Sequence, residues 1–173
     1  EALYCKDSKV SMKMDGMSLV WGTNPDNGKF FVCTKAAFNK KKDRKCYTHD
    51  DLYAHFGHQM EVFEILSHCL TYLPRTENIY WGDWLGFGRT HVLQQNTLTY
   101  VFAEKPMQKL VIAPHTKVTI TGEFCNAKCE QLDEIFDDTS IIKWVQPSVD
   151  RIPPIEFDIT DLDTSKVQFM TPS

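Results

Sequence analysis

The chain has 173 residues, of which 42% are hydrophobic and 24% are charged, and its formal net charge at pH 7 is −4. Its 11 Phe, 6 Tyr and 4 Trp residues exclude a largely disordered protein, because disordered segments are poor in aromatic side chains. The acidic balance argues against nucleic acid as the main partner. No apolar run reaches the roughly 18 residues of a membrane-spanning helix, so we expect no membrane insertion, and the length favours one domain over 1–173.

The N-terminal part, residues 1–47, is predicted to form a β-hairpin followed by a basic loop. Apolar and polar residues alternate within 9–38, a pattern that is typical of half-buried strands. Asp15-Gly16 is a hairpin turn signal, and the Pro/Asn/Gly-rich residues 24–28 predict a loop. The lysine-rich residues 39–47 could hold an anionic partner, but a solvated loop is the simpler interpretation in an acidic chain.

The strongest helix signal covers residues 50–73. Its apolar residues are spaced three or four apart and form one continuous stripe, which predicts a single long helix. The stripe consists of Leu52, Phe56, Met60, Phe63, Leu66, Leu70 and Leu73. Thr48 or Asp50 can cap the helix at its start, and Pro74 ends it.

Turn-punctuated strands follow the helix and predict an antiparallel sheet packed on it. The expected strands cover 79–93, 97–103, 108–113, 116–125 and 129–136, and Pro114 is expected to end the third of them. A short helix is predicted over 137–146 and an extended tail over 147–173. The fold class is therefore α+β, with a core of helix and strands over 48–146.

Six cysteines are present, and an even number is compatible with up to three disulfides. They are Cys5, Cys33, Cys46, Cys69, Cys125 and Cys129. Their spacing does not fit a zinc site, so no metal is expected. We predict that most of them are paired in an oxidising compartment, and a bridge between Cys125 and Cys129 would pin a tight turn. Buried thiols in a cytosolic protein are the alternative.

Residues 122–142 resemble the closing hairpin of the NTF2-like superfamily, in particular its SnoaL-like branch. The segment reads GEFCNAKCEQLDEIFDDTSII, which is similar to a strand, a tight turn and a second strand with an acid–aromatic–Asp pattern. The resemblance implies a curved antiparallel sheet around a long helix, forming a cone with a pocket, here with an additional N-terminal β-hairpin. It also implies an isomerase, dehydratase, cyclase or non-catalytic binding module, because this fold carries all of these.

The predicted strand over 79–93 carries the candidate site. On strict alternation Trp81, Asp83 and His91 project from one face together with Phe87 and Arg89, a mixture that is typical of a ligand pocket. Asp83 and His91 are the candidate proton-transfer groups. In a straight strand they would lie ~26 Å apart, so they cooperate directly only if the intervening glycines bend the chain.

Other binding residues and clusters are predicted as follows. Trp81, Trp84, Phe87, Arg89 and Tyr100 are the candidate binding residues. His58, Glu61 and His68 on the helix are interpreted as a solvated face rather than as metal ligands. Asp137 is interpreted as a helix cap, and Asp133 shares its strand face.

Two functional hypotheses follow from these observations. The first is a small-molecule pocket protein that acts without a cofactor as a lyase, isomerase or cyclase by proton transfer. The second is a secreted, non-catalytic ligand-binding or protein-interaction protein. The expected ligand is a small hydrophobic molecule, and a homodimer is compatible with both hypotheses. A chain that starts at Glu1 fits a secreted mature protein, with the cytoplasm as the alternative location.

Overall fold

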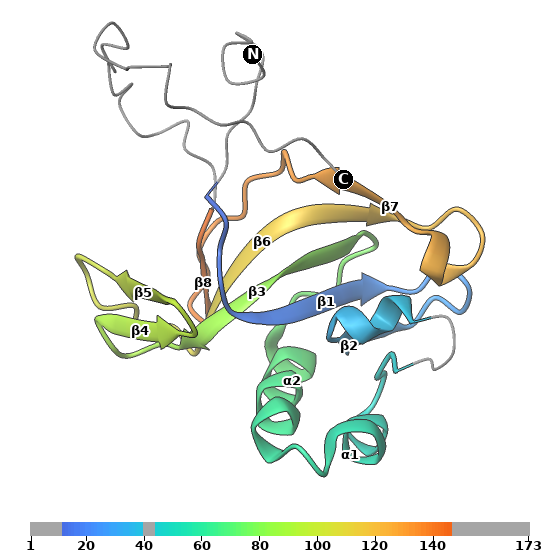
Figure 1. Cartoon of the computed structure of the whole chain (residues 1–173), viewed down its shortest axis with the longest axis horizontal. Helices are drawn as coiled ribbons and strands as arrows, with labels where there is room; N and C mark the ends of the chain where they lie inside the picture. The colour runs from blue at the N-terminus through green and yellow to red at the C-terminus, as the bar shows by residue number, and fades with distance from the viewer. Residues whose placement is uncertain (1–11, 40–43, 147–173) are drawn as a thin grey trace, which may run out of the picture. The chain divides into compact units, whose positions relative to one another are not determined.

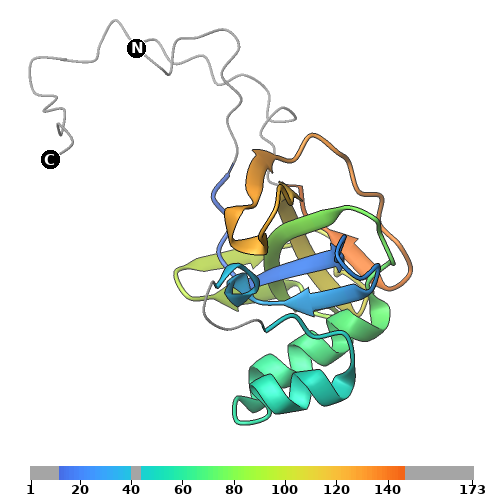
Figure 2. The ribbon, with the colours of Figure 1, turned by 90° about the vertical axis from the view of Figure 1, so that its right-hand side faces the viewer.

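A curved β-sheet organises the described part of the chain, and helices cover one of its faces (Figure 1, Figure 2). The computed structural model describes residues 12–39 and 44–146, all of which fall within one compact unit, Ser11–Pro147. The strand order is β2 (Phe30–Cys33), β1 (Met17–Thr23), β3 (Ile79–Phe87), β6 (Leu110–Thr119) and β7 (Lys128–Gln131), with β8 (Ile142–Trp144) also pairing with β6. The α+β class with a curved antiparallel sheet is confirmed, except that β8 runs parallel to β6.

The predicted long helix is two helices, α1 (His49–Phe56) and α2 (Met60–Tyr72). The start was predicted correctly: the Thr48 hydroxyl accepts from the Asp51 amide, and Asp51 in turn accepts from the Thr48 amide. The prediction of one continuous helix was wrong, because the first helix ends at Gly57. Glycine inside a helix costs about 1 kcal/mol of stability relative to alanine. Met60, expected on the buried stripe, is 66% exposed. None of the described helices is long and apolar enough to span a membrane.

The main core lies between these helices and the sheet. Apolar side chains of β1, β3 and β6 that project from one face pack against the inner face of α1 and α2. The buried members include Leu19, Trp21, Leu52, Leu66, Leu70, Trp84, Leu110 and Ile112. This burial removes the apolar stripe from water and is the main driving force for the fold. The opposite face of the sheet carries two smaller clusters, one near each end of β3.

The N-terminal hairpin forms from β1 and β2, with the expected loop between them. The Asn24 carbonyl accepts from the Gly28 amide at 2.8 Å, and the buried Asn24 side chain bonds to the Tyr47 hydroxyl at 2.9 Å. The predicted turn at Asp15-Gly16 is not a hairpin turn, since β1 begins only at Met17. Part of the basic loop (40–43) and the tail from 147 onward lie outside the described residues.

The predicted strand over 79–93 ends at Phe87, earlier than expected. The chain then turns and forms a separate two-stranded hairpin of β4 (Val92–Gln95) and β5 (Leu98–Val101), which lies beside the main sheet in Figure 1. Arg89 in this turn has a φ of 69°, a left-handed backbone conformation that does not continue a strand. The strand therefore cannot extend to His91.

Two predicted strands are one strand, because β6 passes through Pro114 without ending. Proline lacks an amide donor, but at a bulge no ladder hydrogen bond is required. The strand predicted over 129–136 is limited to β7, and the helix predicted over 137–146 is replaced by β8. The main-chain pairing of Ile142 with Leu110 outweighs the weak helix signal of this short segment.

The segment between β7 and β8 is held to β3 and β6 by the Glu134 carboxylate and by the Phe136 ring. Glu134 accepts from the Tyr80 hydroxyl at 2.5 Å and from the Lys117 ammonium at 2.6 Å. The Lys117 ammonium, followed by the Tyr80 hydroxyl, lowers the pKa of Glu134. Phe136 packs between the rings of Tyr80 and Trp144, with centroids 5.1 and 4.8 Å away. Polar and apolar contacts together fix this segment without regular structure of its own.

The described cysteines differ greatly in their exposure. Cys33, Cys46 and Cys69 are completely buried, and the thiols of Cys33 and Cys46 both donate to the Arg44 carbonyl. Burial raises the pKa of the Cys69 thiol. Cys129 is exposed and Cys125 is half-buried. No disulfide joins any of the described cysteines, and Cys5 lies outside the described residues, so the pairing of most cysteines stays a prediction.

Alkylation with iodoacetamide tests both the fold and the disulfide prediction. In the native protein we expect Cys129 to be modified first and Cys69 only after unfolding, because the reactive species is an accessible thiolate. Peptide mass spectrometry measures the order. In the denatured, non-reduced protein, five or six alkylated cysteines would contradict the disulfide prediction, and two or fewer would support it.

Candidate functional site

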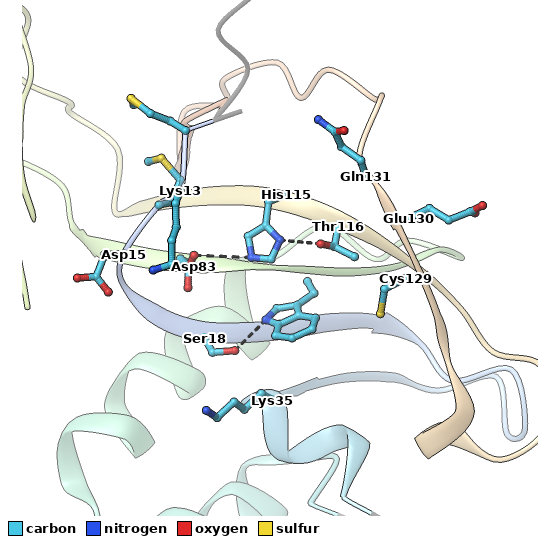
Figure 3. Close-up of a pocket in the computed structure, with 13 residues that line it drawn as sticks. Lys13, Asp15, Ser18, Lys35, Asp83, His115, Thr116, Cys129, Glu130 and Gln131 are labelled. Atoms are coloured by element: carbon cyan, nitrogen blue, oxygen red, sulfur yellow. Dashed lines mark hydrogen bonds and ion pairs between the residues drawn. The ribbon is translucent and has the colours of Figure 1, made fainter. Parts of the chain in front are cut away.

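An open pocket of about 810 Å³ lies on the sheet face opposite α1 and α2 (Figure 3). Its floor is formed by β3 and β6, and its walls come from residues 12–15 and from β7. We call it the open-face pocket, and its lining residues are Met12, Lys13, Met14, Asp15, Ser18, Lys35, Trp81, Asp83, His115, Thr116, Cys129, Glu130 and Gln131. Its size is within the usual range of small-molecule sites.

A β-bulge on the floor places the central histidine. Trp81 pairs with Thr116 and the next residue, Gly82, pairs with Pro114, so His115 has no partner on β3 and is the extra residue. The strands approach closely here, since a Cβ on Gly82 would lie 2.5 Å from the Ala113 carbonyl oxygen. A bulge of this kind redirects a side chain, and here it brings the imidazole into the pocket.

Asp83 projects into the same space from β3. Its side chain is only 15% exposed, and no donor from the described part of the chain hydrogen-bonds to its carboxyl group. Burial, reinforced by the nearby negative charge of Asp15 and opposed by Lys13, raises the pKa of Asp83 to about 6. A carboxyl group that titrates near neutrality and faces a pocket is a candidate acid–base group.

His115 is fixed on one side and open on the other. Its Nδ1 atom lies 2.7 Å from the Thr116 hydroxyl, and its Nε2 atom lies 3.7 Å from Asp83 Oδ2. Burial lowers the pKa of His115, so the ring is neutral at physiological pH. Because Thr116 occupies Nδ1 in either tautomer, Nε2 is the nitrogen left for the pocket.

The Asp83–His115 separation leaves room for a shared third partner. At 3.7 Å the two atoms are too far apart for a normal hydrogen bond, which extends to about 3.2 Å. A ligand atom can lie at ~2.8 Å from both of them at once. One group can then remove a proton from that atom while the other returns a proton to a neighbouring atom, which is general acid–base chemistry.

Trp81 supplies a fixed apolar surface beside this pair. Its indole Nε1–H donates to the Ser18 hydroxyl at 2.9 Å. Its ring centroid lies 5.5 Å from Phe38 and 5.7 Å from His115. With its polar group satisfied and its ring packed on two sides, the indole presents a rigid hydrophobic wall.

Asp15 and Tyr100 join the hairpin to the rim of the pocket. The Asp15 carboxylate accepts from the Thr97 amide at 3.2 Å, the Thr97 hydroxyl at 3.1 Å and the Asn96 side chain at 3.2 Å. The Tyr100 hydroxyl donates to the Asp15 carbonyl at 2.8 Å and accepts from the Asp15 amide at 2.7 Å. The β4–β5 hairpin is thereby held close to the Asp15 carboxylate, whose negative charge helps to raise the pKa of Asp83.

Trp81 and Asp83 line the open-face pocket, whereas Trp84 and Phe87 lie on the other face of the sheet. Trp84 is buried in the main core on the α2 side. Phe87 would share the face of Asp83 on strict alternation, but a second register shift between Trp84 and Gly86 reverses its direction. Phe87 consequently packs against Trp84 and His68, with centroids 5.0 Å from each.

The expected partner of Asp83, His91, is placed elsewhere. His91 is exposed, and its Nδ1 atom lies 3.2 Å from the Phe102 carbonyl in the hairpin. Arg89 is exposed in the turn. Neither Arg89 nor His91 lines the open-face pocket. Tyr100 does not line it either, but its hydroxyl hydrogen-bonds to the backbone of Asp15, which does. The structure therefore does not bring Asp83 and His91 together. The strand predicted to carry both residues ends at Phe87, which lies between them in the sequence.

Sequence analysis missed His115 as a site residue. A signal is present in Pro114, since a proline inside a β-rich segment with strand pattern on both sides predicts a bulge. Interpreting Pro114 as the end of a strand hid the neighbouring histidine. The helix residues His58, Glu61 and His68 form no cluster that could bind a metal, and the described residues contain no such cluster elsewhere.

Replacing Asp83 with asparagine should make stability less dependent on pH. The folded-state pKa lies above the unfolded value, so the wild-type protein loses stability as pH rises from about 4 through about 6. The asparagine side chain cannot ionise, so we expect Asp83→Asn to be nearly equal to wild type at pH 4 and more stable at pH 8. The gain should be about 1 to 3 kcal/mol, with the lower figure allowing for screening by water. Urea denaturation measures this.

The matched control is Asp26→Asn, which changes an exposed carboxylate and should leave the pH profile unchanged. An Asp83→Asn profile parallel to the wild-type profile from pH 4 to 8 would contradict a desolvated carboxyl group at this position.

The comparisons with known proteins place the chain in a family but add no activity. A model of a family of unknown function, DUF6267, matches residues 3–151, which include every residue of the open-face pocket. Comparison with curated proteins and with solved structures gives no match. The family match covers most of the chain, and the protein therefore belongs to the DUF6267 family.

Proposed function

We propose that the open-face pocket binds a small molecule and that Asp83 and His115 transfer a proton to and from it. The activity would be that of a lyase, isomerase or cyclase that needs no cofactor. One observation supports this most strongly: a desolvated carboxyl group and a neutral imidazole lie 3.7 Å apart at the floor of a pocket. Groups that titrate close to the working pH are the most efficient acid–base catalysts.

The roles follow from the environments of the two groups. Above about pH 6 Asp83 is ionised and can accept a proton, while the neutral His115 polarises the ligand or exchanges its Nε2 proton. Thr116 holds the imidazole ring in position. Trp81 provides the apolar contact for a hydrophobic ligand, as in most small-molecule sites.

We also propose that the protein is related to the NTF2-like superfamily. The curved antiparallel sheet with helices on one face is compatible with such a cone. The residues that carry the resemblance, 122–142, form a short 3₁₀ helix (Phe124–Asn126), β7 and the start of β8. The proposed chemistry does not depend on that relationship, because Asp83 and His115 come from β3 and β6.

A non-catalytic binding role is the alternative. Exposure of both Trp81 and Trp84 would favour a protein-interaction surface, but Trp84 is 7% exposed and contributes to the core. Trp81 is half-buried and lines the open-face pocket, so it is the more accessible of the two tryptophans. Secretion, a homodimeric state and a hydrophobic small-molecule ligand stay predictions in both cases.

Hydrogen–deuterium exchange on carbon acids tests the proposal. 1,3-Dicarbonyl compounds and their α,β-unsaturated analogues are incubated with the protein in D₂O, and loss of the α-proton signal is followed by NMR. We expect protein-dependent exchange that rises with pH through about 6, as Asp83 ionises. Asp83→Asn and His115→Gln should each lower the rate by at least about a hundredfold.

The matched control is His91→Gln, which changes an exposed histidine outside the pocket and should keep the wild-type rate. Ligand binding in the pocket without any exchange above buffer would favour the non-catalytic role. A large loss of exchange in His91→Gln together with normal His115→Gln would restore His91 as the proton-transfer group.

A further inference from the structure

The charged side chains of the open-face pocket are unevenly compensated. Five of its lining residues carry ionisable acidic or basic groups other than imidazole and thiol: Lys13, Lys35, Asp15, Asp83 and Glu130. The formal charges of these two lysines and three acids sum to −1, which by itself indicates no preference for an anion. Their partners change this balance, because charges already paired contribute little to ligand binding.

Two of the three acids have partners within the protein. Glu130 forms an ion pair with Lys128, with 2.7 Å between the charged atoms. Asp15 accepts three hydrogen bonds from Thr97 and Asn96, which lower its pKa. Asp83 receives no hydrogen bond from a described residue, and it carries its negative charge above about pH 6.

The two lysines are not compensated in this way. Neither Lys13 nor Lys35 forms an ion pair or a side-chain hydrogen bond with a described residue, and Lys13 influences Asp15 and Asp83 only through longer-range charge interactions. In Figure 3 both lysines lie on the side of the pocket away from Glu130 and Gln131. Among the three acids of the pocket, Asp83 alone lacks a hydrogen-bond donor from the described residues, so it is the carboxylate that a ligand with one negative charge would meet on this side.

The apolar part of the pocket adjoins these lysines. Trp81 forms the rigid wall, and Met12 and Met14 come from the same segment as Lys13. Methionine side chains adapt to flat or irregular apolar shapes. The lysine stems add further apolar surface while their ammonium groups stay solvated.

We infer that the open-face pocket is specific for a carboxylate with an aromatic or flat apolar body. The carboxylate would lie toward Lys13 and Lys35, and the apolar body would lie against Trp81 and the two methionines. The reacting carbon would then face Asp83 and His115. This inference rests on the proposed function only in taking the pocket as a ligand site, and it does not require proton transfer.

A matched pair of probes tests the charge preference: 2-naphthoate and 2-naphthamide, which share size and shape but differ in charge. Binding is measured by NMR from the Trp81 indole N–H and the methyl groups of Met12 and Met14. We expect 2-naphthoate to shift these signals and to bind at least about tenfold more tightly than 2-naphthamide. Raising the ionic strength to about 0.5 M should reduce the difference, because salt screens exposed charges.

Lysine variants locate the effect. Lys13→Gln and Lys35→Gln should each weaken 2-naphthoate binding by about threefold or more and leave 2-naphthamide binding unchanged, because each removes one ammonium charge. The matched control is Lys105→Gln, an exposed lysine outside the pocket, which should change neither. Equal affinity for the two probes, no shift of the pocket signals by 2-naphthoate, or equal effects of all three lysine variants would overturn the inference.

Asp83→Asn separates this inference from the proposed function. It removes a negative charge and should keep or improve 2-naphthoate binding while abolishing proton exchange. Carboxylate preference in wild type without any exchange would remove the proton-transfer role alone. Exchange with no preference between 2-naphthoate and 2-naphthamide would remove the carboxylate inference alone.

Discussion

The register of β3 against β6 is the constraint on which the open-face pocket depends. Two register shifts interrupt this central pair, one at His115 and one at Leu85. The first turns an imidazole toward Asp83, and the second moves Phe87 to the helix side, where it completes the main core. Both shifts lie next to glycines. A side chain at Gly82 would collide with the backbone of β6, and one at Gly86 would collide with the side chain of Leu93 from the β4–β5 hairpin. Local backbone geometry thus decides which residues can act together.

The two faces of the sheet have separate roles because of this arrangement. The helix face is apolar, and it carries the largest cluster of buried residues. On the other face, the described residues that cover the sheet lie near its ends: the short 3₁₀ helix over Lys35–Phe38 and the β4–β5 hairpin. Between these covers the polar residues of the floor remain accessible. A desolvated carboxyl group is tolerated there because stability comes from the opposite face.

Sequence reasoning predicted the elements with strong periodic patterns and missed the local irregularities. The capped helix start at Thr48 and the loop at 24–28 follow from residue type, and the α+β class follows from side-chain spacing. Asp83 and Trp81 were predicted as pocket residues from their shared strand face, and they line the pocket.

The errors also have physical causes. Strict alternation fails at bulges, so Phe87 was assigned to the wrong face and Pro114 was interpreted as a strand end. The short β8 strand depends on pairing with Leu110, far earlier in the chain, and its own residues do not encode such a partner. His115 was missed for the same reason, since its importance lies in a cross-strand register.

The bulge also bears on how insertions and deletions act on this protein. Ala113 and Thr116 belong to the pocket side of β6, and Pro114 pairs with Gly82 directly before the Trp81–Thr116 pair. If His115 were absent, Pro114 and Thr116 would follow one another in ordinary alternation, and the neighbouring pairs would keep their faces. His115 is therefore equivalent to a one-residue insertion in a regular strand. A single-codon event is enough to add the imidazole to this fold or to remove it, with the remainder of the sheet in phase.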